Sequence, residues 1–293
     1  MTIAQAALTG ALIGGLYALM ATGLSVTWGV LRVINLAHFA MILLGAYLTY
    51  ELATATGLDP ILTVLITGPA LFVVGAAVQW AYDRLHVAEF TSLLVSFGLL
   101  IIAIQAVTLI WSADFRRMPG DVNPYATESW TIGRFVFPVT TVLAFGLAVV
   151  LVAALHLVLH RTFAGRGMRA IAQDRAVAAA FGVDHRRLSL VLGGVAGASA
   201  AAAGMVFALT NSLSPTAAYE WFGIVFAVVI LGGIGQVVGT FVAGIAVGVV
   251  SAVVSAAWSP STAPIVLFSA IVLALVLRPQ GLFALRSVVG AGR

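Results

Sequence analysis

Apolar runs of about 20 residues alternate with short polar connections along most of the chain. A helix that crosses a membrane needs a predominantly apolar stretch of about that length. The pattern predicts an all-α integral membrane protein that forms a single domain over residues 1–293, with nine transmembrane helices, or eight to ten. The predicted spans lie near 6–28, 34–50, 61–82, 91–111, 138–160, 188–210, 219–238, 240–258 and 262–278.

The connections between the predicted spans carry residues that break helices. Gly57 and Pro60 mark a turn after the second span, and Pro260 marks another before the last. The segment 112–137 is polar and carries charges of both signs. It is expected to form an exposed loop with room for a short helix.

The composition excludes a soluble globule. Hydrophobic residues make up 62% of the chain and charged residues 8%, with a mean hydropathy of +1.13. Soluble domains carry about 25% charged residues, so this chain has too few polar side chains to cover a surface that faces water.

The arginines predict an orientation, because positive residues concentrate in cytoplasmic connections. The link 161–187 is the most basic connection, so we place it in the cytoplasm; its arginines are Arg161, Arg166, Arg169, Arg175, Arg186 and Arg187. Alternation of the spans then places Arg32, Arg84, Arg278, Arg286 and Arg293 on the same side, and Arg116, Arg117 and Arg134 on the other. The N-terminus is predicted outside and the C-terminus in the cytoplasm.

Missing residue types narrow the chemistry. All 14 basic residues are arginine, so the chain lacks the lysine that a phosphate-binding P-loop requires. It has 0 cysteines, which excludes disulfides and thiolate metal sites. No basic residue precedes the first apolar run, so we expect no cleaved signal peptide. The excess of arginine over acidic residues lies in the connections between spans, where it is explained by membrane orientation. No nucleic-acid partner is therefore predicted.

Small residues recur at four-residue spacing inside the spans. Such pairs let helix backbones approach closely in lipid, and they predict a tightly packed bundle. The pairs are Gly10–Gly14, Gly193–Gly197, Gly235–Gly239 and Gly244–Gly248. The run Gly232-Gly233-Ile234-Gly235 favours a broken helix or a tight turn; it is not a phosphate loop, because no basic residue accompanies it.

The link 161–187 is predicted to contain one short helix, from Met168 to Phe181. Gly165 and Gly167 are expected to allow a sharp exit from the preceding span. Gly182 is placed to end the short helix, and Asp184 to cap the next span.

The two faces of this short helix differ in chemistry. Arg166, Arg169 and Gln173 fall on one side, and the apolar surface comes from Met168, Ile171, Ala172 and Val177. Such a helix suits docking into a groove of a partner protein. A solvated helix attracted to anionic lipid headgroups is an equally good interpretation.

Four segments, in order along nearly the whole chain, resemble the branched-chain amino-acid class of ABC-importer permeases, specifically the shorter of its two permease subunits. They are GLYALMATGLSVTWGVLRVINLAHFAMILLGAY, GRGMRAIAQDRAVAAAFGV, AVVILGGIGQVVGTFVAG and LRPQGLF. One residue departs from the family pattern: Phe39 stands after the His of the Asn-x-Ala-His motif, where the family usually has Gly.

The resemblance implies partners in a multi-pass protein of the bacterial inner membrane. Two cytoplasmic ATPase subunits would bind ATP and Mg, so this chain needs no cofactor of its own. A second, related permease subunit would complete the pair, and an extracytoplasmic binding protein would deliver the substrate. The coupling element for the ATPases would comprise Arg166, Met168, Arg169, Ile171, Ala172, Asp174, Arg175 and Gly182.

Asn35 and His38 are unusual because they carry polar groups at the start of an apolar span. On a helix they share one face with Ile42, Gly45 and Thr49. Polar groups at membrane depth line a watery path or hydrogen-bond to a neighbouring helix. The pair is therefore either part of a translocation path or gate, with Phe39 beside it, or a packing element. No histidine cluster indicates a metal site.

Glu220 is a further candidate for the translocation path, at the predicted outer end of the seventh span. It could meet the ammonium group of an amino acid or an arginine of a partner. The flanking Tyr219 and Trp221 are more simply explained as anchors at the membrane interface.

Two other classes of function compete with the permease of an importer. An ATP-independent secondary transporter usually has charged residues within its spans and inverted repeats, and neither is evident here. An intramembrane hydrolase would need a nucleophile such as Ser199, and the pair His156 and His160 lacks a catalytic acid. Within the importer class, relatives that carry urea, amides or small carboxylates remain alternatives to branched-chain amino acids.

Overall fold

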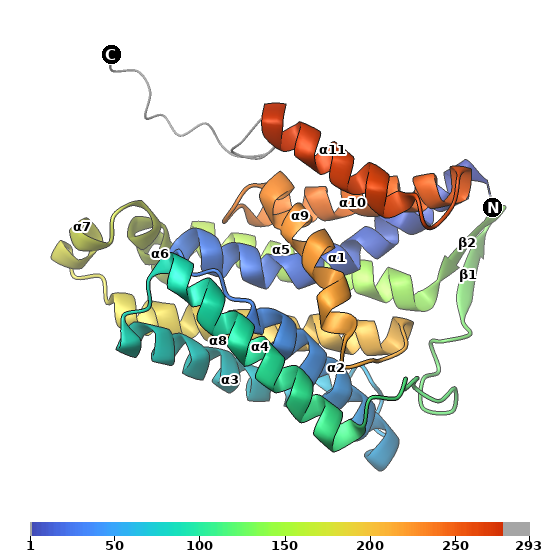
Figure 1. Ribbon diagram of the computed structural model, residues 1–293, viewed down its shortest axis with the longest axis horizontal. Helices are drawn as coiled ribbons and strands as arrows, with labels where there is room; N and C mark the ends of the chain where they lie inside the picture. The colour runs from blue at the N-terminus through green and yellow to red at the C-terminus, as the bar shows by residue number, and fades with distance from the viewer. Residues whose placement is uncertain (1, 278–293) are drawn as a thin grey trace.

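The computed structural model describes residues 2–277 and shows a bundle of long helices lying side by side (Figure 1). The helices are α1 (Ile3–Leu31), α2 (Ala37–Thr56), α3 (Val64–Leu85), α4 (Glu89–Trp111), α5 (Val139–Arg161), α6 (Phe163–Gln173), α7 (Arg175–Ala180), α8 (His185–Thr210), α9 (Ala217–Gly232), α10 (Val237–Ala257) and α11 (Ala263–Leu277). Two short strands, β1 (Ser129–Ile132) and β2 (Phe135–Pro138), complete the elements.

Each predicted span coincides with one helix, but their lengths differ. Within the described residues, 7 helices are long and apolar enough to cross a membrane. The predicted spans 219–238 and 262–278 correspond to the shorter helices α9 and α11, of 16 and 15 residues. A helix of 16 residues is about 24 Å long, which is less than the thickness of a hydrocarbon core of about 30 Å. Figure 1 shows α9 crossing the other helices obliquely.

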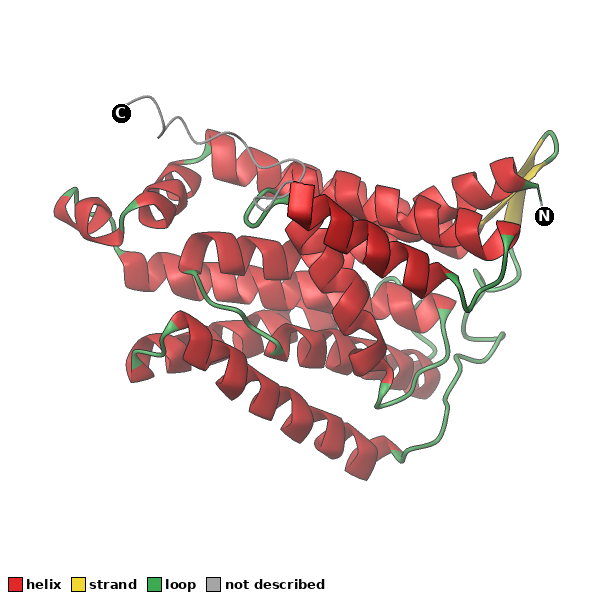
Figure 2. Cartoon of the chain, turned by 45° about the horizontal axis from the view of Figure 1, so that its top comes forward, coloured by secondary structure: helices red, strands yellow, loops and turns green. Residues whose placement is uncertain are grey.

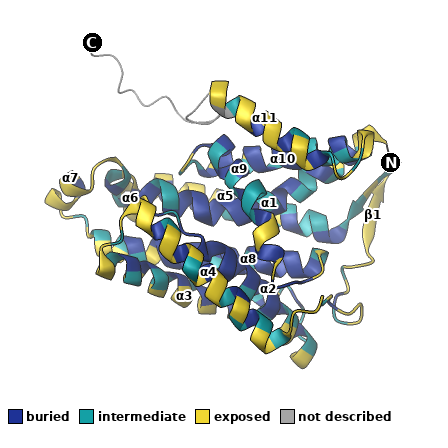
Figure 3. Ribbon diagram, in the orientation of Figure 1, coloured by how far each residue is buried: buried dark blue, intermediate teal, exposed yellow. Residues whose placement is uncertain are grey.

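The core follows α1, α2 and α8, which Figure 3 shows as largely buried. The exposed faces of α3, α4, α5 and α11 carry large apolar side chains, among them Leu65, Ile102 and Val150. These exposed apolar faces are the surfaces that can contact lipid.

Glycines set how closely the central helices approach. A Cβ placed on Gly14 would lie 2.6 Å from the carbonyl oxygen of Gly244, and one on Gly248 would lie 2.2 Å from that of Gly10. The α3–α8 contact has the same character, because a Cβ on Gly197 would lie 2.0 Å from the oxygen of Leu71. These contacts confirm the predicted close packing through small residues.

The predicted pair Gly235–Gly239 is wrong as a pair within one helix. Gly235 precedes α10 with φ +81° and packs against Gly29 of α1. The neighbouring Gly233 also has a positive φ, of +86°. These conformations form the tight turn between α9 and α10, one of the two forms expected from the glycine run.

The segment 112–137 contains a β-hairpin where the sequence left room for a short helix. Ser129 pairs with Pro138 and Ile132 with Phe135 in an antiparallel register. The hairpin turns at Gly133, which has φ +63°. Figure 2 shows the two strands extending beyond one end of the bundle.

The link between α5 and α8 holds two helices, so the prediction of one helix over 168–181 is wrong. Asp174 interrupts it, because its Oδ1 accepts from the backbone N–H groups of Ala176 and Val177 and thereby starts α7. Gly182, with φ +80°, follows α7, and Asp184 caps α8 by accepting from the N–H of Arg187 at 3.1 Å. The predicted stop and cap are both confirmed.

The sharp exit predicted at Gly165 and Gly167 is also wrong. Both glycines lie inside α6, and the chain turns before the helix begins, at Thr162, whose backbone is extended. Gly165 instead allows α6 to fold back on α5, since a Cβ there would lie 2.1 Å from the oxygen of Val158.

We predict that Gly14→Ala destabilises the bundle by about 1–3 kcal/mol, because the added methyl group must displace the backbone of α10. Gly98→Ala is the matched control: it lies inside α4, and a Cβ there meets nothing within 4 Å. The control should be neutral or stabilise by up to about 1 kcal/mol. The midpoint of thermal unfolding in detergent measures both; equal midpoints for the two variants would contradict the close approach.

Candidate functional site

Asn35 and His38 do not share a helical face, which corrects the expectation from their spacing. α1 ends at Arg32, which adopts the left-handed conformation with φ +53°, and α2 begins only at Ala37. The residues between the two helices belong to no helix or strand, so Asn35 precedes the helix that carries His38.

Serines of α4 hold this connecting segment. The N–H of Ile34 donates to Oγ of Ser92 at 3.1 Å, and Oγ of Ser96 donates to the carbonyl oxygen of Ile34 at the same distance. Both serines are buried. Their bonds satisfy backbone groups that lipid could not. Sequence reasoning missed these serines, although two buried hydroxyls at four-residue spacing in an apolar span were a usable signal.

Asn35 organises the start of α2 and joins it to α3. Its Oδ1 accepts from the N–H of Ala37 at 3.1 Å and from the hydroxyl of Tyr82 at 3.3 Å. Asn35 is 6% exposed, so both bonds lie in the interior. These contacts support the packing interpretation of Asn35.

His38 contacts α1 in the centre of the bundle. Its Nε2 lies 2.9 Å from the carbonyl oxygen of Met20, and its Nδ1 is buried without a hydrogen-bond partner among the described residues. A Cβ on Gly23 would meet both the His38 ring and Oγ of Ser199. Ser199 donates to the carbonyl oxygen of Ala196 at 2.8 Å, a bond within its own helix.

Phe39 fills space between α2 and α9. It is fully buried, and its ring centroid lies 4.5 Å from that of Phe222 and 6.2 Å from that of Phe226. A glycine at this position would leave α9 without these aromatic contacts. Phe39, the residue that departs from the family pattern, therefore forms part of the contact between α2 and α9.

A cavity of about 440 Å³ opens beside Glu220, at the end of the bundle near the hairpin. Its walls come from α1, α5, α8, α9 and the irregular residues 211–216. The lining combines hydroxyl, amide and carboxylate groups with apolar side chains; it includes Tyr17, Leu16, Met20, Asn211, Ser212, Glu220 and Ile224. Glu220 lies in the first turn of α9, so the positive end of that helix is close to the same cavity.

Trp221 does not act as an interfacial anchor, which corrects one of the two aromatic assignments. It is 8% exposed, and its ring centroid lies 4.4 Å from that of Phe207, against which it packs edge-on. Tyr219 is 43% exposed. Because the ring of Trp221 also lines the cavity, it belongs to the wall of this site.

The loop 112–137 is tied to the same end by specific bonds. The Tyr125 hydroxyl donates to Oδ2 of Asp59 at 2.6 Å. This bond raises the pKa of Tyr125 to about 12, with smaller contributions from burial and from the charges of Asp59 and Glu128. Nδ2 of Asn123 donates to the carbonyl oxygen of Leu209 at 3.1 Å, which attaches the loop to the end of α8.

The link at the opposite end exposes some of its predicted residues and buries others. Arg166, Arg169 and Asp174 are exposed, as are Arg175 and Gly182, and Ala172 is half-buried. Met168 is 3% exposed and Ile171 6%, because both pack inward between α6 and the bundle. They therefore anchor α6 and cannot supply the docking surface predicted for them.

Other apolar side chains face outward from the link. Phe163 is 83% exposed, Val177 53% and Phe181 85%. Sequence reasoning missed Phe163 and Phe181, since burial of the helix faces depends on how α6 folds back on α5. The guanidinium of Arg166 lies 5.7 Å from the ring centroid of Phe163.

His156 and His160 pair as their spacing predicts, with ring centroids 4.2 Å apart. Among the described residues, no group of three or more metal-ligating side chains gathers.

The fold and these sites define a multi-pass membrane protein with a polar cavity at one end and an arginine-bearing link at the other. Residues 6–277 match the family model described as the branched-chain amino acid transport system / permease component. The chain belongs to this family and is a permease component of the bacterial inner membrane.

Curated relatives cover nearly the whole chain. It is 25% identical over 294 residues to the high-affinity branched-chain amino acid transport system permease protein LivH of Escherichia coli, covering 95% of this chain and 94% of that protein. It is 24% identical to the permease protein BraD of Pseudomonas aeruginosa, with the same coverage. A probable LivH of Methanocaldococcus jannaschii is 27% identical over 80% of this chain and 76% of its own. No solved structure matches the chain.

We predict that Asn35→Leu destabilises the protein by about 1–3 kcal/mol, because two buried donors lose their acceptor. Tyr82→Phe removes only the longer bond and should cost about 1 kcal/mol. Thermal unfolding and the fraction of monodisperse protein in detergent measure both effects. A normally stable Asn35→Leu variant that has lost transport would instead assign Asn35 to a gate.

Proposed function

We propose that this chain is the membrane-embedded permease of an ATP-driven importer for branched-chain amino acids or similar small solutes. The observation that carries the proposal is the separation of two features along the bundle. The mixed cavity with Glu220 opens at the hairpin end, and the exposed link lies at the other end. Solute would enter at one end, and force would be applied at the other.

The cavity suits a small zwitterion with an aliphatic side chain. Glu220 offers a counter-charge for an ammonium group, and the N-terminal end of α9 favours a carboxylate. Leu16, Met20 and Ile224 supply an apolar wall. Its volume of about 440 Å³ lies within the usual range for small-molecule sites.

The link α6–α7 is proposed to couple the permease to its ATPases. Arg166, Arg169 and Gln173 form its exposed polar side, flanked by the exposed rings of Phe163 and Phe181. Met168 packs against side chains of α1 and α5, so a displacement of α6 would be passed to these helices. ATP and Mg would be bound by the partner ATPases. The arginine-bearing end then faces the cytoplasm, as the distribution of positive residues favours.

The remaining partners follow from the family and from the missing ATP-binding motif. Two ATPase subunits, a second related permease and an extracytoplasmic binding protein would complete the importer. The specificity between branched-chain amino acids and urea, amides or small carboxylates is tested by uptake of a panel of these solutes into proteoliposomes that contain the assembled complex.

We predict that Arg166→Glu combined with Arg169→Glu, at two exposed positions of α6, lowers ATPase activity stimulated by loaded binding protein by at least about tenfold. The substitutions place negative charge where an acidic groove would receive the link. Arg134→Glu, in the hairpin at the opposite end, is the matched charge reversal and should leave stimulation unchanged. Normal stimulation in the double variant would remove the coupling role of α6.

We predict that Glu220→Gln lowers uptake of leucine about tenfold while leaving thermal stability unchanged, because the ammonium group of the solute loses its counter-charge and the exposed Glu220 makes no packing contact that stability requires. Glu128→Gln, on the exposed loop at the same end, is the control. Uptake equal to that of the parent protein would exclude Glu220 from the path.

A further inference from the structure

A second polar cavity lies at the arginine-bearing end, away from the Glu220 cavity. It has a volume of about 410 Å³ and lies between the C-terminal end of α3 and the junction of α7 with α8. Its lining consists of Asp83, Arg84, His86, Arg175, His185 and Arg186. The proposed transport path uses none of these residues.

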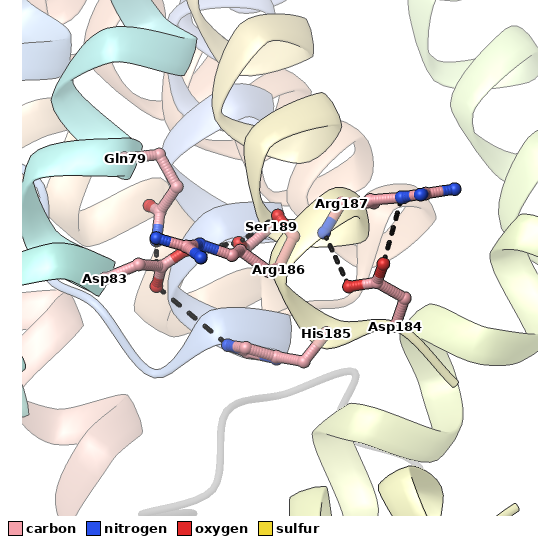
Figure 4. A network of polar contacts seen from close by, with 7 residues as sticks. All are labelled: Gln79, Asp83, Asp184, His185, Arg186, Arg187 and Ser189. Atoms are coloured by element: carbon pink, nitrogen blue, oxygen red, sulfur yellow. Dashed lines mark hydrogen bonds and ion pairs between the residues drawn. The ribbon is translucent and has the colours of Figure 1, made fainter. Parts of the chain in front are cut away.

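The single carboxylate in this cavity is already engaged, as Figure 4 shows. Oδ1 of Asp83 accepts from Nε2 of Gln79 at 3.2 Å and lies 3.9 Å from Nε2 of His185. Oδ2 of Asp83 accepts from the hydroxyl of Ser189. Asp83 therefore joins α3 to α8, and its lone pairs are directed to these groups.

Among the residues that the structure describes, none of the three guanidinium groups forms an ion pair with a carboxylate. Within residues 2–277 the ion pairs are His185–Asp83 and Arg187–Asp184, and neither includes a cavity arginine. Asp174, the nearest acid in sequence to Arg175, accepts from the backbone at the start of α7. The segment 278–293 contains no aspartate or glutamate that could add a side-chain counter-charge.

The cavity thus holds an excess of two positive charges when both imidazoles are neutral. Guanidinium groups bind phosphate through paired hydrogen bonds. An unpaired cluster of such groups in one cavity is the chemistry of an anion site.

We propose that this cavity binds a phosphate group. The neighbouring surface favours the headgroup of an anionic phospholipid as its source. Trp80 is 50% exposed and Leu85 70%, and both lie on α3 within one turn of Arg84. An acyl chain can lie along this apolar face while its phosphate occupies the cavity. Free phosphate has the same chemistry without the apolar contact. The inference is independent of the transported solute.

The test measures phosphate binding by the full chain and by Arg84→Gln/Arg186→Gln. One arm titrates phosphatidylglycerol into protein held in phosphatidylcholine nanodiscs and counts bound lipid by native mass spectrometry. The other arm titrates inorganic phosphate and follows tryptophan fluorescence. A guanidinium that binds the phosphate by a charge-assisted hydrogen bond contributes about tenfold to the affinity, so the double variant should bind at least about tenfold more weakly.

Arg187→Gln is the matched control for charge and position. Arg187 follows Arg186 in the same helix, but its Nε lies 3.0 Å from Oδ2 of Asp184, on the side of α8 away from Asp83 (Figure 4). The Arg187→Gln variant should bind phosphatidylglycerol and inorganic phosphate as tightly as the parent protein does. If the double variant binds phosphatidylglycerol more weakly but inorganic phosphate normally, the ligand of the cavity is a lipid headgroup. If only the binding of inorganic phosphate is weakened, the ligand is free phosphate. Titrations that coincide for the parent and the double variant in both arms would overturn the site, as would equal losses in Arg187→Gln.

Discussion

Close backbone contact between helices is the constraint on which this structure depends. Lipid is as apolar as leucine, so it provides no hydrophobic drive that brings one helix to another. The central helices instead meet where glycine removes the side chain, at Gly14 with Gly244 and at Gly197 with Leu71. Dispersion and packing then act over a large, closely fitted surface. The α1–α10 and α3–α8 pairs form the frame that carries the other elements.

Because α1 lies in the centre of this frame, it connects features that are far apart in the chain. Leu16 and Met20 of α1 line the cavity beside Glu220. The carbonyl oxygen of Met20 lies 2.9 Å from Nε2 of His38. A shift of α1 therefore changes both the wall of the cavity and the only hydrogen bond of the His38 side chain among the described residues. The same helix therefore joins the wall of the cavity to the contact of His38 in the centre of the bundle.

Several buried polar side chains bond to backbone groups that lie outside the helices or at their ends. Ser92 and Ser96 form hydrogen bonds with the backbone groups of Ile34 in the connection between α1 and α2, and Asn35 accepts from the first turn of α2. The cost of an unpaired backbone group in lipid explains why these side chains are kept in otherwise apolar spans. The cavity at the arginine-bearing end differs, because three arginines and one carboxylate, Asp83, line it and positive charge is in excess there.

The sequence by itself determined the features that depend on local composition. The apolar runs predicted a membrane bundle with a helix at each predicted span, Gly182 and Asp184 marked the end of one helix and the start of the next, and the ordered motifs identified the permease family. Other features depend on which surfaces meet in space. Only the tertiary structure decided that Asn35 precedes its helix, that Met168 and Ile171 face inward, and that Trp221 lines a cavity. Helical periodicity gives the relative direction of side chains but not the neighbour they meet, and glycine contacts between distant helices set those neighbours.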